Sequence, residues 1–99
     1  MIEQDYRVER EDGATSGRYV IRIAPGAEGE MTYRRLAPGL VAIDHTGVPR
    51  QYRGKGLAEK LVQAAIADAR AEGGRIVPLC SYVAAQFRRH PEWEDLRAT

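Results

Sequence analysis

The stretch that decides the fold is VPRQYRGKGLAEKLVQAAIADARAEGG, Val48 to Gly74. From Leu57 onward its apolar residues recur at i, i+4 spacing, which predicts an amphipathic helix. A Gly-Gly pair ends the pattern where a left-handed helix cap is expected. Gly54 and Gly56 stand just before the helix. Three basic residues share the same turn: Arg50, Arg53 and Lys55. The stretch therefore predicts a bare, positively charged turn at the start of a long helix.

The chain before this turn has the pattern of short strands. Apolar and polar residues alternate in segments separated by turn residues, which favours an antiparallel meander. The expected strands are 6–11, 17–23, 30–36 and 40–48, the last being the most apolar and the expected central strand, and Ala24–Gly29 is an expected turn.

The chain after the helix adds a strand and a helix. Residues 75–80 form a short expected strand, in which Pro78 implies an edge position or a bulge. Ser81 is the expected cap of a second helix, 82–90. On the first helix, Asp68 is expected to point outward with the other polar residues. The predicted order is β-β-β-β-α-β-α, an α+β fold in which two main helices pack on a mostly antiparallel, twisted sheet.

Composition narrows the classes of protein. With 99 residues, 43% hydrophobic and 29% charged, we expect one globular domain, 1–99. A net charge of +1 argues against a nucleic-acid partner. The lone cysteine, Cys80, allows neither an internal disulfide nor a cysteine zinc cluster. We also expect no metal, no membrane partner and a cytoplasmic location, because the sequence shows neither a signal peptide nor a membrane-length apolar run.

The glycine turn has the character of an anion site. The first N–H groups of a helix lack partners inside it, and the helix dipole is positive there. Glycines remove side chains that would keep a phosphate from the backbone. The turn is not a Walker loop, because Gly54-Lys55 is followed by Gly56, nor a dinucleotide loop, because Glu59 stands where a third glycine belongs. The alternative is a helix start that glycines merely soften.

Two longer segments carry a resemblance to a known family. Gln51-x-x-Gly54-x-Gly56 resembles the acyl-CoA pyrophosphate loop of the GNAT-type N-acetyltransferases. HTGVPRQYRGKGLAEKLV and VPLCSYVAAQFRRHPEW resemble a minimal-length GNAT-like family of predicted N-acetyltransferases. The resemblance runs from Tyr19 to Trp93. It implies transfer of acetyl from acetyl-CoA to an amine of a small molecule or of an exposed protein group.

The same resemblance implies where acetyl-CoA would bind. Residues 43–48 would line the thioester, residues 75–79 would form the other lip of an opening in the sheet, and the helix from Ser81 would flank the thiol. The pantetheine and pyrophosphate would be held by nine residues: Val48, Gln51, Tyr52, Arg53, Gly54, Lys55, Gly56, Leu57 and Ala58.

Acid, base or nucleophile must come from His45, Cys80, Tyr82 or Ser81. His45 can exchange a proton near neutral pH, or can simply bond a neighbouring backbone group. Cys80 could carry the acetyl group, or be a small apolar residue. Tyr82 could protonate the leaving thiolate, or serve packing.

The chain departs from full-length GNAT enzymes on the acceptor side. Those enzymes carry two helices after the first strand, whereas here only short turns separate the strands. The acceptor side would be open and shallow unless a second copy covers it, so a homodimer is possible. A non-catalytic acyl-CoA-binding module or an interaction domain is the alternative function. The basic run Arg88-Arg89-His90 favours a solvated helix end over a contact with the adenosine phosphate.

Overall fold

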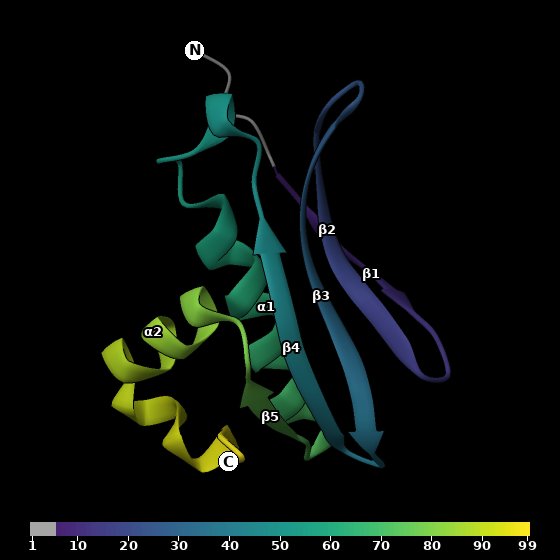
Figure 1. Cartoon of the computed structure of the whole chain (residues 1–99), viewed down its shortest axis with the longest axis vertical. Coiled ribbons are helices and arrows are strands. Elements are labelled where there is room, and N and C mark those ends of the chain that lie inside the picture. Colours follow the sequence, from purple (N-terminus) through teal and green to yellow (C-terminus); the bar gives the residue numbers. More distant parts are fainter. Residues whose placement is uncertain (1–5) are drawn as a thin grey trace.

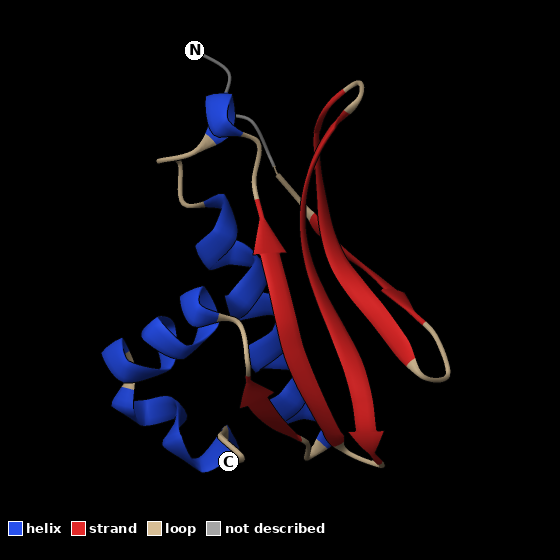
Figure 2. Cartoon of the chain, viewed as in Figure 1, coloured by secondary structure: helices blue, strands red, loops and turns tan. Residues whose placement is uncertain are grey.

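The computed structural model describes residues 6–99. A five-stranded sheet is covered on one face by helix α1, and α2 lies beyond its β5 edge (Figures 1 and 2). The elements are β1 (Val8–Asp12), β2 (Ser16–Ala24), β3 (Ala27–Ala37), β4 (Leu40–Gly47), the 3₁₀ turn η1 (Arg50–Tyr52), α1 (Leu57–Glu72), β5 (Arg75–Pro78), α2 (Ser81–Arg89) and η2 (Pro91–Leu96). Within 6–99 no helix has the length and apolar character needed to cross a membrane.

The strands lie in sequence order across the sheet. β1 to β4 form an antiparallel meander, and β5 pairs parallel to β4 after the crossover through α1. The predicted α+β class and element order are therefore confirmed. β4 is an interior strand as expected, but β3 occupies the middle of the sheet. Pro78 lies on the edge strand β5, where its missing N–H is tolerated.

The hairpin that joins β2 to β3 is tighter than the sequence suggested. The expected turn Ala24–Gly29 shrinks to Pro25 and Gly26, and β3 begins at Ala27. Gly26 makes this possible because its φ of 78° lies in the left-handed region. The two strands are consequently long and project beyond the rest of the sheet (Figure 1).

The core lies between α1 and one face of the sheet. The i, i+4 residues of the predicted helix are buried there, with Leu61 fully enclosed and Leu57 only 2% exposed. They pack against alternating residues of β2 and β3, including Ile21 and Met31. Asp68 does not point outward as predicted: it accepts hydrogen bonds from Tyr19 Oη at 2.8 Å and from an Arg10 Nη1 at 3.0 Å. A polar residue at the edge of a buried face can serve a neighbour's donor instead of water.

The other face of the sheet is held by ion pairs. Arg18 contacts Glu11, Glu28 and Glu30 at 2.7 to 3.0 Å. Val20 is fully buried on this face, beside the paired strands that carry these side chains. The aliphatic stems of long charged residues can cover such an apolar position. Among the described residues no helix packs over this face; β1, β2 and β3 follow one another through short turns.

The second helix begins one residue before the predicted start. Its N-cap is Cys80, and no side chain caps it, so the predicted Ser81 cap is wrong. Ser81 is already inside the first turn, where its hydroxyl is not placed to accept from the N2 or N3 amide. The far end is anchored by Phe87, whose ring contacts Trp93 edge-on at 5.7 Å. The C-terminal segment then closes the β5 edge, because Ala98 N donates to Ile76 O at 2.7 Å.

Candidate functional site

The sheet opens between β4 and β5 where β5 ends. The parallel pairing runs from Leu40 opposite Arg75 to Ile43 opposite Pro78. The carbonyl of Ile43 then accepts from both Leu79 N at 3.0 Å and Cys80 N at 2.9 Å, and the chain leaves the sheet to form α2. Among the residues that the structure describes, β4 continues to Gly47 paired only with β3. Its last four residues therefore face the opening with one backbone edge unpaired.

The glycine turn places the start of α1 beside this free edge of β4. Gly54 and Gly56 have φ values of 82° and 77°, and an added Cβ at either position would meet no atom within 4 Å. Gly56 is the N-cap of α1 and offers no side chain to the first helical amides. Serine, threonine, aspartate or asparagine normally fills that role. Within residues 6–99 the first-turn amides are consequently free of side-chain acceptors, and the space in front of them is open.

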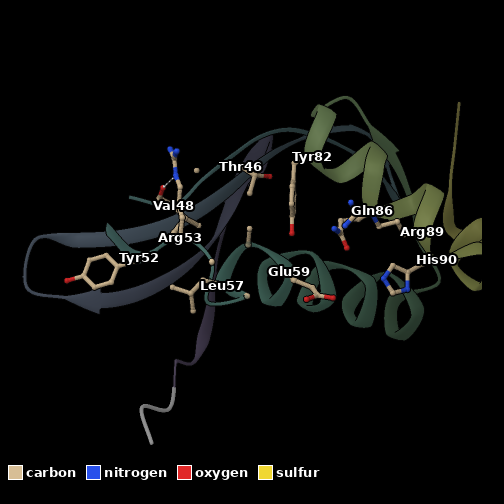
Figure 3. A pocket seen from close by; sticks show the side chains of 14 residues that line it. Thr46, Val48, Tyr52, Arg53, Leu57, Glu59, Tyr82, Gln86, Arg89 and His90 are labelled. Carbon is tan, nitrogen blue, oxygen red and sulfur yellow. Dashed lines mark hydrogen bonds between the residues drawn. The ribbon is translucent and has the colours of Figure 1, made fainter. Parts of the chain in front are cut away.

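Arg53 braces the turn. Its Nε donates to the carbonyl of Val48 at 2.9 Å, and its own N–H donates to Arg50 O at 3.2 Å. The hydrogen bond to Val48 joins the end of β4 to the segment that precedes the helix, and it is visible as a dashed line in Figure 3. The rest of the guanidinium is free to face an anion.

A pocket of about 510 Å³ lies between the glycine turn, the end of β4 and α2. Figure 3 shows side chains from α1 on one side and from α2 on the other. The lining residues are Thr46, Gly47, Val48, Tyr52, Arg53, Gly54, Gly56, Leu57, Ala58, Glu59, Tyr82, Gln86, Arg89 and His90. Two guanidinium groups oppose one carboxylate, so the pocket is positive overall.

The pocket contains most of the residues predicted to bind the cofactor. Seven of the predicted positions line it: Val48, Tyr52, Arg53, Gly54, Gly56, Leu57 and Ala58. Gln51 and Lys55 were also predicted, but both are exposed and outside the lining.

The three catalytic candidates are not brought together. Tyr82 lines the pocket and extends from α2 toward α1, with Thr46 on one side and Gln86 on the other (Figure 3). Cys80 is half-buried just behind Thr46, with Sγ 3.5 Å from Thr46 Oγ1. His45 is exposed and outside the pocket lining. A bulge places His45 rather than Asp44 opposite Thr32, and the ring lies against Gly47, where a Cβ would be 3.1 Å from Nε2.

Tyr82 is held in its neutral form. Burial raises the pKa of the phenol, the nearby Glu59 carboxylate raises it further, and Arg89 offsets part of the increase. A phenol that resists ionisation can donate a proton but is a poor base at neutral pH. Among the candidates, Tyr82 is therefore placed to act as a donor.

Sequence reasoning missed part of the pocket wall. Gln86 on α2 and Glu59 on α1 were not predicted to line a site, and Arg89 and His90 were assigned to a solvated helix end. The signal was present, because Tyr82, Gln86 and Arg89 are spaced i, i+4, i+7 and so share one face of a helix. Thr46 and Gly47 lie within the range 43–48 that the resemblance placed at the thioester.

The groups that line the pocket suit a phosphate-bearing, partly apolar ligand. Unpaired amides at a helix start and guanidinium groups bind phosphate. The free edge of β4 offers backbone donors and acceptors to an amide-containing chain. Leu57, Val48 and the ring of Tyr82 give an apolar lining between them. An acyl-CoA has these three parts: pyrophosphate, a pantetheine arm with amides, and a thioester.

Comparisons with known proteins agree with this geometry. The family model described as GCN5-related N-acetyl-transferase matches residues 18–96. A GCN5-like protein from Staphylococcus aureus, assigned as an N-acetyltransferase, is 27% identical with a TM-score of 0.69, over 91% of this chain and 87% of that chain. A protein from Klebsiella pneumoniae assigned as an acyl-CoA N-acyltransferase is 26% identical with a TM-score of 0.54, over 76% of this chain and 56% of that chain.

A third similar structure shows the fold. The ribosomal-protein-alanine N-acetyltransferase of Brucella melitensis biovar Abortus has a TM-score of 0.61 at 20% identity, over 88% of this chain and 64% of that chain. Because the family model covers most of the chain and the fold and pocket agree with it, this protein belongs to the GCN5-related N-acetyltransferase family.

Proposed function

We propose that this protein is an acetyl-CoA-dependent N-acetyltransferase whose acceptor is an amine of a small molecule or of an exposed protein group. One observation carries the proposal: the uncapped N-terminus of α1, behind two glycines with open space, forms one pocket with the unpaired end of β4. The family uses acyl-CoA. The acetyl donor and the acceptor are our proposal.

Different residues along the pocket bind different parts of acetyl-CoA. The amides from Gly54 to Ala58, with Arg53, bind the pyrophosphate. The free backbone edge of residues 44–47 hydrogen-bonds the pantetheine arm and stabilises the oxyanion that forms when the amine attacks. When bound, acetyl-CoA supplies an acyl group on a good leaving thiolate. The neutral Tyr82 hydroxyl, which lines the pocket near Thr46, donates the proton that the departing sulfur requires. The resulting phenolate regains a proton from the nitrogen that has attacked the thioester, so the amide product and the free thiol leave with Tyr82 neutral again.

Cys80 and His45 have different places in this proposal. Cys80 lies beside Thr46 and at the N-cap of α2, so an acetyl group could be held on its sulfur during transfer. His45 is outside the pocket and pairs with Thr32 just beyond the bulge, so a direct role for it requires an acceptor that approaches from that side. The face of the sheet there is open, which favours a large acceptor, or a second copy of the chain as a cover.

The test combines binding with transfer. Calorimetric titration of the full chain with acetyl-CoA should show one site, and mass spectrometry after incubation with an amine and peptide panel should show acetylated product. Intact-protein mass spectra will show an added acetyl group on Cys80 if that route is used, and Cys80→Ala removes it. Binding without any transfer would support a non-catalytic acyl-CoA-binding module. Absence of binding would contradict the proposal.

A further inference from the structure

The wall that α2 contributes to the pocket contains polar groups with no partner in the protein. Gln86 is only 5% exposed, yet within residues 6–99 its carboxamide makes no side-chain hydrogen bond, unlike the half-buried Asp68, which accepts from both Tyr19 and Arg10. No enclosed polar atom of the described chain lacks a partner. The carboxamide must therefore open into the pocket that Gln86 lines, where a ligand can complete its hydrogen bonds.

Arg89 is one turn further along the same face and is also unpaired. In the described part of the chain it forms no ion pair, whereas Arg10, Arg18, Arg22, Arg34, Arg35, Arg70 and Arg97 each contact a carboxylate. Arg88 and Arg89 both complement the negative end of the α2 dipole. Of these two arginines only Arg89 lines the pocket, so its guanidinium can also bind a ligand there.

His90 completes this end of the pocket with a fixed ring. It stacks on Trp93 at 3.9 Å between centroids with an interplanar angle of 11°. Its Nδ1 lies 2.9 Å from Glu92 Oε2, which orients the imidazole. In the described residues Nε2 has no protein partner, so it remains available to a ligand that occupies the pocket.

One cavity therefore has two separate anion-binding ends. The glycine turn and the start of α1 form the first, and Gln86, Arg89 and His90 form the second. Figure 3 shows them at opposite ends of the pocket, with Glu59 and Tyr82 between them. A ligand with a single phosphate would use only the first. Coenzyme A carries a pyrophosphate and, on its ribose, a separate 3′-phosphate.

We propose that Gln86, Arg89 and His90 bind the 3′-phosphate of the adenosine of coenzyme A and make the site discriminate coenzyme A from its 3′-dephospho form. This inference rests on the proposed function, because it places the same cofactor in the same pocket. The guanidinium supplies a charge-assisted contact and the carboxamide N–H a further donor. Because the carboxylate of Glu92 takes the Nδ1 proton, Nε2 of His90 donates to the phosphate when the ring is protonated.

Two ligands that differ only by this phosphate test the inference. The full chain should bind coenzyme A about tenfold or more tightly than 3′-dephospho-coenzyme A, as expected for loss of a charged hydrogen-bonding group. Arg89→Ala should bring the ratio of the two affinities close to one, while affinity for the dephospho form stays nearly unchanged. Gln86→Leu should lower the ratio by about threefold to fivefold, as expected for loss of a neutral hydrogen bond.

Arg88→Ala is the matched control, since it removes the same charge from the same helix end outside the pocket. It should leave the ratio unchanged, and circular dichroism should show the same fold in all variants. Equal binding of both ligands by the parent would overturn the inference while leaving the proposed function standing, as would an Arg88→Ala effect equal to that of Arg89→Ala. Failure of the parent to bind either ligand would contradict the proposed function itself.

Discussion

The two halves of α1 border two polar regions that differ in how completely their hydrogen-bonding groups are paired within the protein. At the C-terminal half, Arg10 lies 5.2 Å from the ring centroids of both Tyr19 and Tyr33, and it donates to Asp68 at 3.0 Å and to Glu72 at 2.8 Å. The cavity there measures about 30 Å³. At the N-terminal half, helix amides without a side-chain cap border a pocket of about 510 Å³.

The difference shows how the same residue types serve structure or binding. In the first region Nε and Nη1 of Arg10 and the hydroxyls of Tyr19 and Tyr33 all have acceptors within the chain, so the polar groups hold β1, β2 and β3 against α1. In the second, the carboxamide of Gln86 and the guanidinium of Arg89 have none in the described chain, and there is room for a ligand. Unsatisfied polar groups next to open volume identify the ligand site more specifically than charge alone.

The largest expected effect is a loss of acetyl-CoA affinity when the open region at the start of α1 is blocked. In Gly56→Leu a side chain enters the space in front of the first helical amides, so affinity for acetyl-CoA should fall by about 100-fold, equivalent to roughly two charge-assisted hydrogen bonds. Calorimetric titration measures the change.

Gly26→Leu is the control for backbone strain. Gly26 has a φ of 78° against 77° for Gly56, and an added Cβ meets open space in both cases. Both variants should lose about 1–2 kcal/mol of stability from the left-handed conformation. If the Gly26 variant loses as much affinity as the Gly56 variant, the glycine turn is not the phosphate site.

The next effect concerns the closed region. Arg10→Ala leaves the Asp68 and Glu72 carboxylates and the Tyr33 hydroxyl without the donor they share, so the free energy of unfolding should fall by about 2 kcal/mol, discounted for partial exposure of the guanidinium. Urea unfolding measures it. Arg22→Ala removes an arginine that also contacts three carboxylates, but its side chain is 53% exposed. The expected loss there is below about 1 kcal/mol, and acetyl-CoA affinity should be unchanged in both variants. Equal losses of stability in the two variants would contradict the distinction between the enclosed Arg10 cluster and the exposed ion pairs of Arg22.

A smaller effect appears at alkaline pH. Burial, and then the hydrogen bond to Asp68, raise the pKa of Tyr19 well above its ordinary value of 10.0. Above pH 10 the unfolded chain loses this proton while the folded chain keeps it, so stability that is present below pH 10 is lost as the pH rises. Tyr19 alone should contribute roughly 1 kcal/mol of loss between pH 9 and 11. The free energy of unfolding of Tyr19→Phe, measured at each pH, should therefore fall less than that of the parent over this range. An equal fall in the two proteins would show that Tyr19 ionises freely in the folded protein.

The smallest expected effect tests the sign of the charge in the open pocket. Glu59 is the carboxylate among the lining residues and stands in the first turn of α1. Glu59→Gln should raise acetyl-CoA affinity about threefold, because it removes repulsion of the phosphates. It should also cost about 0.3–1 kcal/mol of stability, because the carboxylate complements the helix dipole. Glu94→Gln, an equal charge change in η2 outside the pocket, should leave affinity unchanged; a decrease for the Glu59 variant would contradict the assignment of the pocket to an anion.

Local pattern was sufficient to predict the elements and their class. The i, i+4 series from Leu57 and the alternation in β2 reflect burial of one face, which is a property of neighbouring residues. The position of Pro78 on an edge strand followed from its missing N–H. The Ser81 cap failed because helix starts depend on where the preceding strand releases the chain, here at the Ile43 carbonyl.

The candidate site was less predictable because it depends on tertiary placement. The glycine turn could be predicted from its composition, and seven of its predicted residues line the pocket. The position of His45 outside the pocket could not be predicted, because a bulge in the pairing of β3 and β4 sets the direction of that side chain. Gln86, Arg89 and His90 enter the site only through the packing of α2 next to the start of α1.

The most direct measurement is a ¹⁵N–¹H spectrum of the protein titrated with acetyl-CoA. We expect the amide signals of Gly54 to Glu59, of Thr46 to Val48 and of the Tyr82–Arg89 face of α2 to shift together and to saturate at one equivalent. Signals of Arg10, Tyr19, Tyr33 and Asp68 should stay in place. Shifts confined to that closed cluster, or no shift at Gly54 and Gly56 at saturation, would contradict the claim that the open end of α1 holds coenzyme A.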